Sequence, residues 1–77
     1  MTQTNTKLIL YTTTNCSACD AARADLTADG VDFEERNVMV KQQYYDEVLQ
    51  YSISVPVILK DGKVEIGWKG DLGCPIF

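Results

Sequence analysis

Apolar positions divide the first half of the chain into two strands around one helix. Residues 7–11 (KLILY) are almost continuously apolar and precede a polar loop, which predicts a buried strand. From about 16 to 29, alanines and one leucine recur at helical spacing, and Asn15 and Gly30 are expected to cap the two ends. Residues 31–38 begin with alternating apolar and polar side chains, as a second strand does. Together they predict a strand–helix–strand unit with parallel strands.

The second half of the chain predicts a short helix followed by a hairpin. Apolar side chains recur three and four positions apart over about 41–50, which indicates an amphipathic helix. Residues 55–59 are apolar, with a proline near the start where a strand tolerates it. Asp-Gly at 61–62, before residues 63–66, favours a two-residue type I′ turn. The order β-α-β-α-β-β predicts an α/β fold with a mixed four-stranded sheet, in a single domain over residues 1–77.

Composition and charge limit the classes of partner. The 77 residues are 45% hydrophobic, enough for one small core. No apolar run approaches the roughly 20 residues of a membrane span, and no basic-then-apolar leader opens the chain, so we expect a cytoplasmic protein. A net charge of −4 argues against nucleic acid and membrane as partners. The excess acid lies within residues 1–35, which indicates a solvated helix face or a docking surface for a basic partner.

Two of the three cysteines form a Cys16-Ser17-Ala18-Cys19 motif, and the chain has no histidine. Lack of histidine excludes Cys-His and Ser-His-Asp nucleophile sets. The motif follows a strand at the start of a helix, where unpaired N–H groups and the helix dipole stabilise a thiolate, although Asp20 opposes that effect. One turn separates the two thiols, so the motif favours thiol–disulfide exchange over two unrelated core cysteines.

Cys74, the third cysteine, leaves more alternatives open. An odd count argues against the disulfide framework of a secreted protein. Cys74 is a surface thiol without a role, a regulatory or mixed-disulfide thiol, or a metal ligand. Three thiols without histidine leave a zinc or iron–sulfur site one ligand short, so we predict no metal site within one chain. A metal or iron–sulfur carrier would use Cys16 across a dimer, and metal and sulfide analysis of anaerobically purified protein tests that alternative.

Motifs along nearly the whole chain resemble the glutaredoxin branch of the thioredoxin superfamily. They are Leu-Tyr-Thr at 10–12 before the two cysteines, Gly-Val-Asp-Phe-Glu-Glu at 30–35 with Asn-Val at 37–38, Ser-Val-Pro-Val-Ile at 54–58, Asp-Gly at 61–62 and Gly-Trp at 67–68. Within this branch the chain most resembles the small NrdH-type redoxins, which also carry a tryptophan after the last strand.

The resemblance implies a thioredoxin-like fold and an oxidoreductase that reduces protein or small-molecule disulfides, with roles in electron transport and cell redox homeostasis. It makes Cys16 the nucleophile and Cys19 the resolving thiol, with a redox-active Cys16–Cys19 disulfide and no bound cofactor. It also implies a cis-proline loop in which the Val55 backbone pairs with an incoming chain. The expected substrate- and thiol-binding residues are Thr14, Asn15, Ser54, Val55, Pro56, Trp68, Gly70 and Asp71.

Departures from the family pattern bear on the electron donor. Thr14 and Asn15 stand where glutathione-linked members often carry a cation, and only Asp71 lies near the place of their acidic pair. We therefore expect thioredoxin reductase as donor and a disulfide-containing protein as substrate, with a glutathione-dependent glutaredoxin as the alternative. Trp68 is either a docking surface for a protein reductase or an aromatic cover for the sheet edge.

The end of the chain departs from the family as well. After the last predicted strand only a short segment with glycine and proline remains, so the C-terminal helix of the family is missing or truncated. One face of the sheet should then be half uncovered. We expect Ile76 and Phe77 of the tail, or a second subunit in a homodimer, to cover it.

Overall fold

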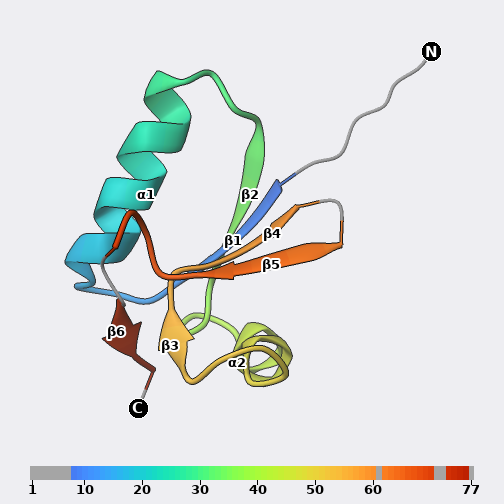
Figure 1. The fold of residues 1–77 in the computed structure, drawn as a ribbon. Coiled ribbons are helices and arrows are strands. Elements are labelled where there is room, and N and C mark those ends of the chain that lie inside the picture. The colour runs from blue at the N-terminus through green and yellow to red at the C-terminus, as the bar shows by residue number, and fades with distance from the viewer. Residues whose placement is uncertain (1–7, 61, 71–72, 77) are drawn as a thin grey trace.

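The computed structural model describes residues 8–60, 62–70 and 73–76, and Figure 1 shows how they fold. The predicted order of strands and helices is confirmed, with one strand divided in two and one strand added near the C-terminus. The elements are β1 (Leu8–Thr12), α1 (Ser17–Ala28), β2 (Phe33–Asn37), α2 (Gln42–Val48), β3 (Ser54–Val55), β4 (Val57–Lys60), β5 (Lys63–Ile66) and β6 (Cys74–Pro75).

The main sheet has four strands in the order β2-β1-β4-β5. β1 runs parallel to β2 and antiparallel to β4, and β5 pairs antiparallel with β4, so the predicted mixed sheet is confirmed. Lys60 pairs with Lys63, which leaves two residues for the predicted hairpin turn. Gly62 has the positive φ of 78° that such a turn requires, whereas Asp61 lies outside the described residues.

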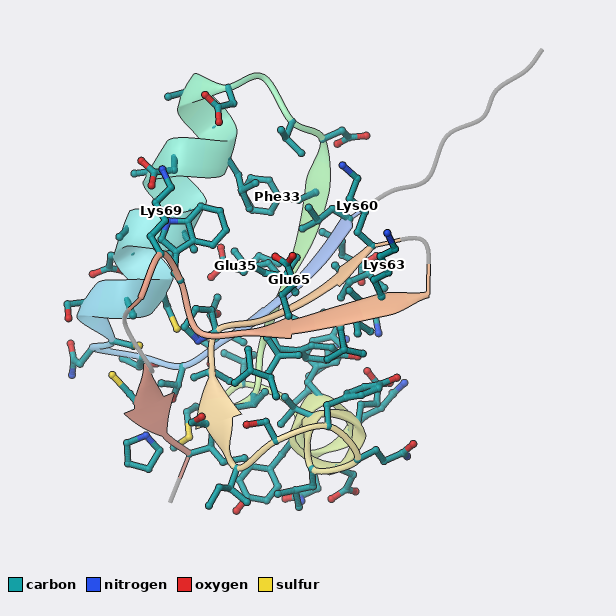
Figure 2. The ribbon with its side chains drawn as sticks, in the orientation of Figure 1. Phe33, Glu35, Lys60, Lys63, Glu65 and Lys69 are labelled. Carbon is teal, nitrogen blue, oxygen red and sulfur yellow. The ribbon has the colours of Figure 1, made fainter. Side chains whose placement is uncertain are left out.

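One face of the sheet packs against α1. Leu10 of β1 and Ile58 of β4 point to this face, where they meet Ala22 and Leu26 of the helix. Small alanines let α1 approach the sheet closely, and Figure 2 shows Phe33 between the helix and the strands. This cluster, called the α1-side cluster below, fixes α1 against the central strand. It therefore also fixes the start of the helix, which carries the cysteines.

The opposite face packs against α2 and also holds a polar network. Tyr11 of β1 is buried with Val48 and Val57. Its hydroxyl donates to Glu47 at 2.9 Å, and Arg36 of β2 donates to the same carboxylate at 2.8 Å. These bonds tie α2 to β1, which leads into the cysteine loop, and to its neighbour β2.

The 55–59 segment differs from the single strand that its apolar pattern predicts. Val55 belongs to β3, which pairs with β6 in a separate two-stranded sheet, and Pro56 separates it from β4. The predicted N-cap is also wrong. Asn15 takes a left-handed φ of 59°, and Cys16 is the residue that caps α1. An asparagine tolerates that conformation better than most residues, so it bends the loop instead of capping the helix.

The expected uncovered face lies beside α1, as a groove of about 480 Å³ between the helix, β4 and β5. Trp68 lines it and covers part of the face, and its indole N–H donates to Asp25 of α1 at 2.8 Å. Lys63 and Glu65 of β5 also line the groove, and Figure 2 shows Glu65 directed toward α1. The other residues lining it are Leu8, Leu26, Ile58 and Lys60.

Ile76 does not cover that face, which corrects the prediction for the tail. It is buried in the cluster of the opposite face, together with Val55 and Val57. Phe77 lies outside the described residues. Strand alternation explains why the tail does not cover the groove. Val64 and Ile66 pair with β4 residues that face away from α1. The groove side of β5 is therefore polar and offers little apolar surface to bury. Within the described ranges no helix is both long and apolar enough to cross a membrane.

Candidate active site

The site begins where the loop after β1 turns into α1. Cys16 has an extended backbone with φ of −112°, and its sulfur accepts the Cys19 backbone N–H at 3.3 Å. A sulfur therefore occupies the place of the usual capping oxygen and satisfies a donor that the first helical turn leaves without a partner. Cys19 lies one turn further along the helix and is also buried.

The cis-proline loop lies against the cysteines, as the family resemblance implied. The Val55–Pro56 peptide bond is cis, and the Val55 carbonyl accepts the Cys16 thiol at 3.8 Å. Cys16, Cys19 and Val55 all have exposed fractions of 0%. Thiol–disulfide exchange needs an accessible attacking thiol. Cys16 is instead enclosed, because the cis-proline loop and the tail pack around it.

The two thiols differ in acidity although both are buried. Burial raises the pKa of Cys16, but hydrogen bonds from the Cys19 and Cys74 thiols and from the N–H groups of Cys19 and Ala18 outweigh it and lower the pKa below its ordinary value. Burial raises the pKa of Cys19 strongly, and its bond to the Cys16 sulfur raises it further. Asp20 points to solvent and pairs with Arg23 at 2.8 Å, so that carboxylate is held by a cation of its own helix.

Iodoacetamide should alkylate Cys16 of the reduced protein before Cys19. A lowered pKa means that the Cys16 thiolate appears as the pH rises toward the ordinary cysteine value, whereas Cys19 stays protonated well above it. The rate should therefore rise with pH through the lowered pKa of Cys16 and then level off. Peptide mass mapping after timed quenching assigns the modified residue, with Cys16→Ser as control. Modification of Cys19 first would contradict the assignment of roles.

The remaining predicted site residues lie at different distances from the cysteines. Thr14 and Asn15 are exposed in the loop just before Cys16, and the Thr14 hydroxyl accepts from Asn37 at 3.4 Å. Ser54 belongs to the same short strand as Val55. Trp68 packs with the α1-side cluster and not with the cluster of the thiols, which supports its role as a cover of the sheet. Gly70 is exposed, and Asp71 lies outside the described residues.

Two residues near the C-terminus belong to the site although sequence reasoning did not place them there. Cys74 packs against the cluster that contains Cys16 and Cys19. Gly73 has a φ of +88°, and a Cβ at this position would collide with the Val55 carbonyl. A glycine directly before the cysteine was the one available signal, since it permits both the positive φ and the close approach. In the part of the chain that the structure describes, no group of three or more histidine, cysteine or acidic residues is placed to hold a metal ion.

Comparisons with known proteins agree with this geometry. The family model described as Glutaredoxin matches residues 8–65. The Gene 56 protein of Mycobacterium phage L5 is 34% identical over 65 residues, which cover 80% of this chain and 63% of the phage protein. The crystal structure of a glutaredoxin from Archaeoglobus fulgidus superposes with a TM-score of 0.72, at 24% identity, over 83% of this chain and 77% of that one. The fold is therefore the thioredoxin-like fold that glutaredoxins share.

Proposed function

Because the chain belongs to the glutaredoxin family, whose members carry out thiol–disulfide redox chemistry, we propose that it reduces protein or small-molecule disulfides through Cys16 and Cys19. The observation that carries the proposal is the Cys16 sulfur, which accepts the Cys19 N–H and lies against the Val55 carbonyl before the cis proline. More specifically, we propose that the protein transfers electrons in the cytoplasm, as the NrdH-type redoxins do.

Each residue then has a definite part in the reaction. The Cys16 thiolate attacks one sulfur of the substrate disulfide, a Cys16–substrate bond forms, and the other substrate sulfur leaves with the electron pair and takes up a proton. Cys19 gives up its proton and attacks the Cys16 sulfur. The second substrate thiol leaves, and the Cys16–Cys19 disulfide remains for an external donor to reduce. A raised Cys19 pKa keeps the resolving thiol protonated until a leaving thiolate is at hand to take the proton.

Coupled reduction assays with NADPH test this function. One assay supplies thioredoxin reductase and the other supplies glutathione with its reductase, each with a protein disulfide and with hydroxyethyl disulfide as substrates. Turnover above the uncatalysed rate in either assay supports the oxidoreductase. No turnover in both, with folded and fully reduced protein, would contradict it.

Thioredoxin reductase should be the more efficient electron donor. Thr14 and Asn15 offer no cation beside the thiols, so a glutathione carboxylate has no charged partner there. If Trp68 is part of the docking surface for the reductase, Trp68→Ala should raise KM more than it lowers kcat.

Trp68→Phe is the matched control, since it keeps an aromatic ring in the α1-side cluster but loses the N–H bond to Asp25. A fall in melting temperature without a change in KM would assign Trp68 to the sheet cover alone. Efficient turnover with glutathione, unaffected by either substitution, would favour the glutathione-dependent alternative.

A further inference from the structure

The tail of the chain occupies the backbone edge beside the nucleophile. β6 pairs antiparallel with β3, and Cys74 lies directly opposite Val55. Figure 1 shows the two short strands side by side, apart from the main sheet. Antiparallel partners opposite one another come within about 4.5–5.5 Å at their Cα atoms. The Val55 backbone, which was expected to pair with an incoming chain, is therefore paired with the protein's own residue, and that residue is a cysteine.

Close contacts hold this tail in place. The Ile76 N–H donates to the Ile53 carbonyl at 3.1 Å, and the Ile76 side chain is only 3% exposed. Gly73 approaches the Val55 carbonyl so closely that no side chain fits there. Cys74 packs against the buried cluster that contains Cys16, and it lies opposite Val55, whose carbonyl accepts the Cys16 thiol. Cys74 also helps to lower the pKa of Cys16. A third thiol is thus held against the cluster of the nucleophile, on the backbone edge where a substrate chain was expected to pair.

We propose that Cys74 is a third redox thiol, which exchanges with disulfides formed at Cys16 and gives a Cys16–Cys74 bond. The proposal rests on the proposed function, since a disulfide must first form at Cys16. Cys74 then acts as a substrate thiol carried by the chain itself, and β6 must leave Val55 before another chain can pair there. The docked tail also accounts for the complete burial of Cys16, because it packs in the cluster that encloses this thiol.

The exchange balances without an external oxidant. Cys74 loses its proton, and its thiolate attacks the Cys16 sulfur of a Cys16–substrate or Cys16–Cys19 disulfide. The Cys16–Cys74 bond forms as the older S–S bond breaks. The departing sulfur, from the substrate or from Cys19, leaves with the electron pair and takes up the proton. The number of disulfides is unchanged, so the oxidising equivalent moves from one pair of sulfurs to another.

A pair of variants that lack Cys19 tests this step with hydroxyethyl disulfide as the probe. In Cys19→Ser, the mercaptoethanol adduct on Cys16 should form and then disappear, with release of a second mercaptoethanol and a Cys16–Cys74 link in the peptide map. In Cys19→Ser with Cys74→Ser, the adduct should persist. Equal persistence in both would overturn the proposal and leave the proposed function intact. No adduct in the double variant, with folded protein, would overturn both.

Two glycine variants in the Cys19→Ser background show whether the docked tail is responsible. Gly73→Ala places a methyl group against the Val55 carbonyl, so it should displace β6 and cause loss of the Cys16–Cys74 link. Gly62→Ala is the matched control, because it has a similar positive φ but nothing within 4 Å of the added carbon. Faster adduct loss in Gly73→Ala than in Gly62→Ala would contradict the placement of Cys74 by β6.

Discussion

Replacement of Cys16 by serine should lower disulfide reduction by about 1,000-fold or more, the scale on which enzymes lose rate when their nucleophile is removed. A serine hydroxyl stays protonated where a thiol of lowered pKa is ionised, and it forms no disulfide. Cys19 cannot take over, since its burial still holds the pKa of its thiol above the ordinary value. The coupled assay with a protein disulfide measures the loss.

Ser17→Ala is the matched control, because Ser17 belongs to the same motif but its side chain is exposed. This variant should keep most of the activity and the melting temperature. If Cys16→Ser kept activity within about tenfold of the unchanged protein, another thiol would have to start the reaction. Cys16 would then not be the nucleophile.

Leu10→Ala should cause the largest loss of stability among single core substitutions, about 2–5 kcal/mol in the free energy of unfolding. Leu10 is 0% exposed, in the strand that pairs on both sides, and it contacts the α1-side cluster. Removal of its side chain leaves a cavity that the paired backbone of β1 cannot close. For a domain of this size each kcal/mol lowers the melting temperature by roughly 4–8 °C, so thermal unfolding measures the effect directly.

Ile53→Ala is the control for the loss of a large aliphatic side chain, because Ile53 is 59% exposed. Its stability should change by about 0.5 kcal/mol or less, as for most surface substitutions. If both variants unfold at the same temperature, the α1-side cluster does not hold the sheet together as the packing indicates.

The main sheet could be predicted from the sequence because its signals are local. Gly30 after the alanine-rich stretch marks the end of α1, and the apolar run of β1 identifies the central strand. The loop around Asn15 and the division at Pro56 were not predictable in the same way. Both depend on how the backbone bends to bring the thiols and Val55 together, and that is decided by contacts between segments far apart in the chain.

The cysteine pair could likewise be predicted, since motif, strand and helix start are adjacent in sequence. Burial of Cys16 and the position of Cys74 could not, because the residues that enclose the thiol come from the other end of the chain. Trp68 shows the same limit. Its place after the last strand suggested docking, but which side the indole faces is settled by Asp25, a residue on α1.

Because β6 pairs with β3, the redox state of the cysteines should also affect the stability of the fold. A bond between Cys16 and Cys74 would close most of the chain into a ring, whereas a bond between Cys16 and Cys19 closes a single helical turn. A ring of roughly 60 residues restricts the unfolded chain by about 4 kcal/mol, against about 2 kcal/mol for the small loop. The position of one disulfide would then set how strongly the tail is tethered, and the protein would resist heat and carboxypeptidases differently in its two oxidised forms.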